Sequence, residues 1–156
     1  MKKDDNKKKI QKFNQKSDFF NYIKDKFNKE DLIMVHGSTA YERIKSYSDF
    51  DMEIHGKKVK KPYYEIIFIK EKPVLVSVYF KLYNKGTKIK PPKGIKLIKG
   101  IYTDKTDTRF IRMYQEGHYN QKEKLKRECQ LIADFCFKYF RSKDRKYMQY
   151  VQKRIN

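Results

Sequence analysis

A chain of 156 residues is long enough for one domain with a small appendage and too short for two full-sized domains. Lys and Arg number 39 against 19 Asp and Glu, and the formal net charge of +20 favours an anionic partner such as nucleic acid, anionic lipid or a phosphorylated small molecule. The longest apolar runs have only the length of strands and none follows the charged N-terminus, so the sequence predicts neither a membrane span nor a secretion signal.

The chain begins with a basic arm that leads into a helix. Residues 1–16 are rich in lysine and contain little that could be buried, which predicts a flexible arm. Ser17 is a suitable capping residue, and apolar residues follow it at helical spacing. The pattern therefore predicts the first helix over residues 17–28.

Two strands with a short helix between them are expected next. The apolar run at residues 32–35 predicts a buried strand that ends at Gly37, and Ser38 is expected to cap a short helix through about residue 47. In residues 48–54, acids alternate with apolar side chains. Because alternate residues of a strand share a face, this segment is predicted to be a half-buried strand with its acids on one side.

A hairpin and a basic loop follow. Residues 63–70 and 73–80 are rich in β-branched and aromatic residues and are joined by a tight Glu71-Lys72 connection, which predicts a hairpin. Residues 81–99 carry several lysines, no acid, and Gly and Pro interruptions, which predicts a basic loop. The loop could contain a short strand at residues 95–98.

The C-terminal third is expected to be helical. Residues 106–117 and 142–155 are predicted helices, and between them an apolar stripe over residues 125–140 repeats at i, i+4 and i+7 spacing. Cys129 and Cys136 lie on this stripe and are expected in the core. Since two cysteines cannot build a disulfide framework, a reduced, cytoplasmic setting is expected.

Two features in the first third of the chain point to a nucleotide and its metal. Gly37 and Ser38, at a turn from strand to helix, are expected to present N–H groups and a hydroxyl at the positive end of a helix, a natural site for a phosphate. Asp49 and Asp51 are spaced i, i+2 on a strand, so their carboxylates repel one another unless a cation lies between them. Mg²⁺ bridging to nucleotide phosphates is the usual solution.

This order of apolar strand, Gly37-Ser38, short helix and Asp49-x-Asp51 resembles the minimal signature of the DNA polymerase β-like nucleotidyltransferase superfamily. The next two predicted strands are similar to the pair that follows in archaeal CCA-adding enzymes, so the resemblance covers residues 32–80. It implies an α+β fold with a nucleotidyltransferase-type mixed sheet of four or five strands and flanking helices. The nucleotidyltransferase-like core would span residues 17–105, with a C-terminal helical region over residues 106–156.

The resemblance also implies an activity, the transfer of NMP from an NTP to a hydroxyl on nucleic acid, protein or a small molecule. Asp49 and Asp51 would be the catalytic residues and would ligate Mg²⁺ or Mn²⁺, while Gly37 and Ser38 would bind the nucleotide. The basic loop and the C-terminal helices would contribute Lys and Arg to phosphates, or to RNA or another polyanion as the acceptor.

The sequence departs from the family at the third carboxylate, where the matching residue is Ser77. A neutral serine gives less charge stabilisation and cannot take a proton at neutral pH. Glu65 would lie opposite Ser77 if the hairpin turn is centred on Glu71, and on the other face if the turn is Glu71-Lys72. Glu53 could substitute only if its strand bends.

Several alternatives therefore stay open. The chain could be a degenerate nucleotidyltransferase that binds nucleotide or nucleic acid as an adaptor, or an antitoxin-like module with a helical protein partner or a second copy of itself. The lysine excess could reflect genomic composition or adaptation to heat, and the acids could be solvated on an edge strand. No role is assigned to His36, and His55 and His118 are expected at the surface.

Overall fold

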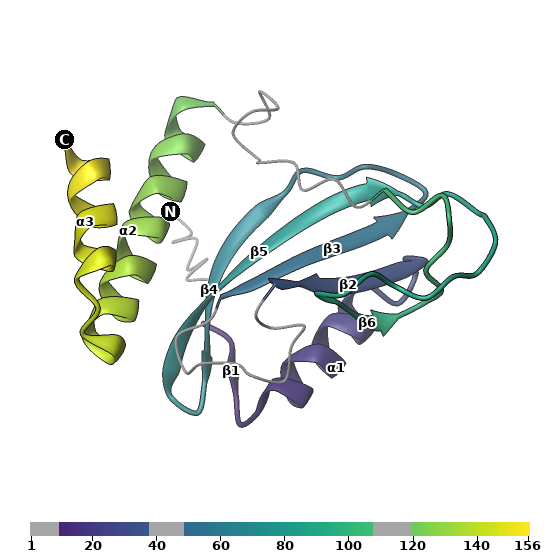
Figure 1. Ribbon diagram of the computed structural model, residues 1–156, viewed down its shortest axis with the longest axis horizontal. Coiled ribbons are helices and arrows are strands. Elements are labelled where there is room, and N and C mark those ends of the chain that lie inside the picture. The colour runs from purple at the N-terminus through teal and green to yellow at the C-terminus, as the bar shows by residue number, and fades with distance from the viewer. Residues whose placement is uncertain (1–9, 38–48, 108–119) are drawn as a thin grey trace, which may run out of the picture.

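The computed structural model describes residues 10–37, 49–107 and 120–156. Within them, six strands form one mixed sheet in the order β1-β4-β5-β3-β2-β6 (Figure 1). Their bounds are β1 (Lys12–Phe13), β2 (Leu32–His36), β3 (Phe50–Gly56), β4 (Tyr63–Ile69), β5 (Lys72–Leu82) and β6 (Ile95–Lys99). The expected α+β class is confirmed, and the described part of the sheet has one or two strands more than expected.

Both edge strands come from segments with weak local patterns. Lys12 and Phe13, which belong to the predicted basic arm, pair with the end of β4 as a parallel strand. The Phe13 ring anchors them, because its centroid lies 5.4 Å from those of both Phe19 and Tyr22. At the other edge, β6 pairs antiparallel with β2. The optional strand over residues 95–98 is thus present.

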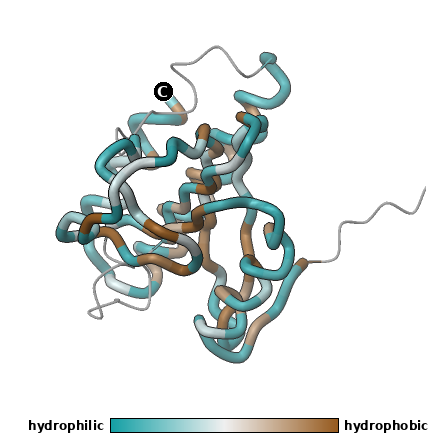
Figure 2. Tube along the Cα trace, turned by 90° about the vertical axis from the view of Figure 1, so that its right-hand side faces the viewer, coloured by the Kyte–Doolittle hydropathy of each residue, from teal (hydrophilic) through white to brown (hydrophobic). Residues whose placement is uncertain are grey.

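The helix α1 (Lys16–Lys26) covers one face of the sheet and builds the main core. Gln15 rather than Ser17 is its N-cap, in a capping box with Asp18. Phe19 and Ile23 are fully buried against one face of the strands. That face is contributed mainly by Ile33, Val35, Phe50, Met52, Ile54, Val76 and Val78. Figure 2 shows the corresponding concentration of hydrophobic residues in the central strands.

The β4–β5 hairpin has a two-residue turn one position earlier than expected. Lys70 and Glu71 both have positive φ, 49° and 61°. Positive φ at both central residues is the mirror-image turn geometry that matches the right-handed twist of a hairpin. Ile69 consequently pairs with Lys72, and both of the turns predicted from the sequence are wrong in register.

The two C-terminal helices, α2 (Gln121–Ser142) and α3 (Arg145–Ile155), lie side by side at one end of the sheet (Figure 1). Asn120 caps α2 and accepts from the N–H of Glu123 at 3.0 Å. The helices expected over residues 125–140 and 142–155 are therefore confirmed. No helix among the described residues is long and apolar enough to cross a membrane.

The orientation of α2 differs from the expectation. Cys129 is exposed and Cys136 is half-buried, so the prediction that both are core residues is wrong. The buried residues of α2 are instead three charged ones, Arg127, Asp134 and Lys138. The physical reason is that α2 turns its charged side toward the sheet, where ionic partners lie, and α3 covers only part of the apolar stripe.

Three expectations concern segments outside the described residues. The short helix at residues 38–47, with its Ser38 cap, falls there, as does His118. Most of the helix expected over residues 106–117 also lies outside. Of that segment, Thr106 and Asp107 are described and are not helical.

Candidate functional site

The face of the sheet opposite α1 carries the polar residues of β3. Asp51, Glu53 and His55 alternate with the core residues of that strand, as the acid and apolar alternation predicts. In the paired register, Asp51 is flanked by His36 on β2 and by Ser77 on β5. Neighbouring strands are about 4.8 Å apart, so these side chains form one row across the sheet.

Asp49 and Asp51 form an interacting pair of carboxyl groups. Burial and the nearby charge of Asp49 raise the pKa of Asp51 to about 7, while Lys138 and His36 act in the opposite direction. Asp51 is half-buried, and the Asp49 side chain is 34% exposed. Two carboxylates placed this way ionise together only when a cation compensates them. The donor set therefore fits a hard divalent cation at the more open Asp49 side.

Helix α2 brings a further acid and a cation to the same place. Lys138 Nζ lies 2.8 Å from Asp134 Oδ2 and 3.4 Å from Asp49 Oδ1. Asp134 and Lys138 are only 5% and 8% exposed. The two carboxylates raise the pKa of Lys138, although burial opposes them. The ammonium group thus stays charged and compensates the acids of the site.

Sequence reasoning missed Asp134 and Lys138. The available signal was their i, i+4 spacing within a mostly apolar helical stripe, where a buried pair of opposite charges needs an explanation. Their partner Asp49 lies 89 positions before Lys138, and no local pattern predicts that contact.

Replacing Lys138 tests its role as the cation of the site. In Lys138→Met, the acids lose their compensating charge, so we expect a free energy of unfolding lower by about 3 kcal/mol in EDTA. Mg²⁺ should then stabilise the variant more than the wild type in thermal unfolding, because the ion no longer competes with an ammonium group. Lys122→Met, at an exposed position of the same helix, is the matched control. An equal Mg²⁺ shift in wild type and Lys138→Met contradicts this role.

Ser77 occupies the position beside Asp51 where the family resemblance implies a third carboxylate. Its neighbour on β4 is Tyr64, while Glu65 pairs with Val76 and lies on the α1 side of the sheet. Glu65 is therefore excluded as the replacement. The reason is the Lys70-Glu71 turn, since moving a hairpin register by one residue moves every side chain to the other face.

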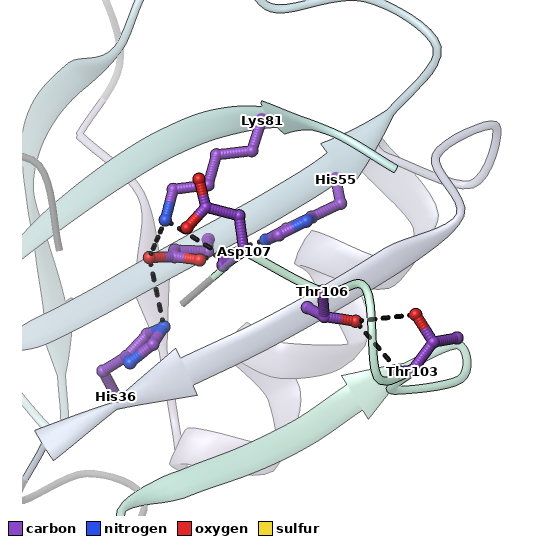
Figure 3. Close-up of polar contacts among 7 residues, drawn as sticks. His36, His55, Lys81, Thr103, Thr106 and Asp107 are labelled. Carbon is purple, nitrogen blue, oxygen red and sulfur yellow. Dashed lines mark hydrogen bonds and ion pairs between the residues drawn. The ribbon is translucent and has the colours of Figure 1, made fainter. Parts of the chain in front are cut away.

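Glu53 is engaged in a buried network of its own beside Asp51. Its carboxylate is 2.9 Å from Lys81 Nζ, 3.0 Å from His55 Nε2 and 3.4 Å from His36 Nε2. Figure 3 shows His36, His55 and Lys81 converging from three strands. Burial raises the pKa of Glu53, but the contacts with His36, His55 and Lys81 outweigh it and lower the pKa to about 2. Glu53 is thus an ionised partner within this network.

Two expectations about this region are wrong. His55 is fully buried rather than at the surface, and Lys81 is 9% exposed in β5 rather than part of a loop. The segment after β6 lies against Lys81, because Lys81 Nζ also donates to the Asp107 carbonyl at 3.2 Å. Thr103 secures this segment by donating from its hydroxyl to the Asn84 carbonyl at 3.0 Å, and its contact with Thr106 is drawn in Figure 3.

Gly37 lies at the end of β2, next to the site. Its φ of +70° is a left-handed value that favours glycine, and a side chain there would meet open space. The Gly37 N–H donates to the Gly94 carbonyl at 3.1 Å. This N–H group is therefore engaged within the protein rather than open to a phosphate. Ser38, the other predicted phosphate contact, lies outside the described residues.

The described residues contain no group of three His, Cys, Asp or Glu side chains arranged to hold a metal ion. What they contain is the Asp49–Asp51 pair with Lys138 beside it. No family model matches the sequence, and no curated protein shows significant similarity to it.

Proposed function

We propose that the protein is a nucleotidyltransferase that binds a magnesium-bound NTP and transfers NMP to an acceptor hydroxyl. The observation that carries the proposal is the Asp49–Asp51 pair, in which burial and the neighbouring charge raise the pKa of Asp51 to about 7. The Lys138 ammonium compensates only part of the charge of these two carboxyl groups, since the pKa of Asp51 remains raised. A bound divalent cation would explain why they are there.

Each residue at or near the Asp49–Asp51 pair would have a separate role in binding the metal or the nucleotide. Asp49 and Asp51 would hold Mg²⁺, which when bound neutralises charge on the phosphates and on the leaving group. Lys138 would turn from the carboxylates to a phosphate oxygen once the metal compensates the acids. Asp134, 2.8 Å from Lys138, would keep that ammonium group at the site. The left-handed turn at Gly37 would leave room for the nucleotide.

Ser77 favours a second candidate, a nucleotide-binding adaptor with no transfer activity. It is 3% exposed and lies directly beside Asp51, where a carboxylate would activate the acceptor hydroxyl. A serine there cannot act as a base at neutral pH. Glu65 cannot replace it, and Glu53 already has three partners.

The test is an assay with each labelled NTP, Mg²⁺ or Mn²⁺, and RNA, protein and small-molecule acceptors. We expect transfer by the wild type and a loss of about 10³-fold in Asp49→Asn, because a metal ligand supplies several kcal/mol of transition-state stabilisation. Asp25→Asn, an exposed change on α1, is the control. Transfer that survives Asp49→Asn overturns the assigned role. Magnesium-dependent NTP binding without transfer favours the adaptor, and no nucleotide binding removes both candidates.

A further inference from the structure

A pocket of about 200 Å³ lies between the start of β4 and the first turns of α2. Its lining comes from residues 61–64 on one side and from Glu123, Lys126, Arg127 and Gln130 on the other. The α2 residues are spaced i, i+3, i+4 and i+7, so they share one face of the helix. None of these residues belongs to the carboxylate site.

The lining carries three cations and one carboxylate. Lys61 pairs with Glu123, and Lys126 is exposed and forms no ion pair with a described residue. Arg127 is 8% exposed, and its guanidinium lies over the Tyr64 ring, 5.3 Å from the centroid. Its Nε also donates to the Tyr64 hydroxyl at 3.3 Å. Arg127 also pairs with Glu128, outside the lining. The pocket therefore combines the exposed Lys126 and two ion-paired cations with an aromatic wall.

Tyr64 connects this pocket to the carboxylate site. It pairs across the hairpin with Ser77, which in turn pairs with Asp51. Two strand spacings separate Tyr64 from Asp51, so the two residues are roughly 10 Å apart across the strands. Gln130 holds the same strand, since its Nε2 donates to the Tyr64 carbonyl at 3.3 Å. One extended ligand can thus reach both places.

We propose that this pocket binds a backbone phosphate of a single-stranded nucleic-acid acceptor. A volume near 200 Å³ is below the usual range for a whole small-molecule ligand. It suits a phosphate with part of its sugar. The net charge of +20 favours a polyanion, and Lys61 and Lys126 are exposed residues of the lining. Its role as an acceptor site rests on the proposed function, whereas the binding itself does not.

The test is the binding of a short, labelled single-stranded RNA by fluorescence anisotropy, in EDTA and without NTP, over a range of salt concentrations. Removing one lysine–phosphate contact to a single strand reduces the steepness of log affinity against log salt by about 0.7. We expect that reduction in Lys126→Gln and about twice that reduction in Lys61→Gln/Lys126→Gln, with affinity falling roughly 3- to 10-fold per lysine. Both positions are exposed enough for the variants to fold.

Lys124→Gln is the matched control, since it makes the same charge change outside the lining, about 200° around α2 from Lys126. An equal loss in Lys124→Gln overturns the pocket, because it would show general charge attraction. Inorganic phosphate or free NTP that binds in a Lys126-dependent way, with RNA unaffected, assigns the pocket to a free phosphate compound and overturns the nucleic-acid proposal. Because this binding assay contains neither NTP nor metal, it reports on the pocket alone, so a failed reaction and a failed pocket give different results.

Discussion

Asp51→Asn should make the protein more stable at pH 8 and about 10³-fold less active in the NTP transfer assay. The pKa of Asp51 is raised from its usual 3.8 to about 7. The folded state therefore binds this proton more tightly than the unfolded state does, and wild-type stability falls as the pH rises from about 4 to about 7. Asparagine carries no charge, so the variant escapes this loss and should gain about 3 kcal/mol at pH 8.

The measurement is the free energy of unfolding in EDTA at pH 5 and pH 8 for wild type and Asp51→Asn. We expect the gain at pH 8 to shrink at pH 5, where Asp51 of the wild type is largely protonated. Added Mg²⁺ should stabilise only the wild type, because the variant lacks one ligand. A variant that is less stable than the wild type at both pH values would show that the Asp51 carboxylate is structural, and would contradict a site built for a cation.

Glu53→Gln should have the opposite effect and destabilise the protein by about 3 kcal/mol at pH 7. Glu53 is 1% exposed, and its pKa is lowered from 4.5 to about 2. Its stabilisation is therefore fully present above about pH 4.5 and is lost as the pH falls toward 2. Glutamine leaves the buried Lys81 ammonium without its carboxylate, which adds a desolvation cost.

Urea unfolding between pH 7 and pH 3 tests this prediction. The difference between wild type and Glu53→Gln should narrow as the pH falls below about 4.5, since the wild type then loses its own carboxylate. Glu71→Gln, at an exposed turn position, is the control and should change stability by less than about 0.5 kcal/mol. A difference that stays constant over the whole pH range would indicate altered packing rather than a missing charge.

These two predictions separate the roles of neighbouring acids on one strand. Asp51 and Glu53 are two residues apart and share a face of β3. Burial is the largest influence on both, and it raises both pKa values. Glu53 has three nitrogen partners that reverse this effect, whereas Asp51 faces another carboxylate. The ionised carboxylate therefore stabilises the folded state at Glu53 and destabilises it at Asp51.

Local patterns in the sequence were sufficient for most of the sheet. Apolar runs and period-two alternation predicted β2, β3, β4 and β5 to within two residues at each end, and helical spacing predicted α1. They also placed the acids of β3 on one face and its core residues on the other. Such patterns succeed because the side-chain period of a strand or helix is a property of a few consecutive residues.

The composition of the site depended on contacts between distant segments. The turn at Lys70-Glu71 decided that Tyr64 rather than Glu65 lies beside Ser77. A change of one residue in a turn leaves the hydrophobic pattern of both strands almost intact, so periodicity does not reveal it. The burial of Lys81 is a similar case, since its Nζ donates to the carbonyl of Asp107, 26 positions further along the chain.

The sequence by itself determined the order of α1, β2, β3, β4 and β5 and the shared face of Asp51 and Glu53, and it predicted Asp49 and Asp51 as metal ligands. Only the tertiary structure brought Asp134 and Lys138 from α2 to that pair. The physical reason is that α2 has both an apolar stripe and a charged face, and either could pack inward. The charged face packs against the sheet because the buried Lys138 ammonium group finds carboxylate partners there, while α3 covers part of the apolar stripe on the other side.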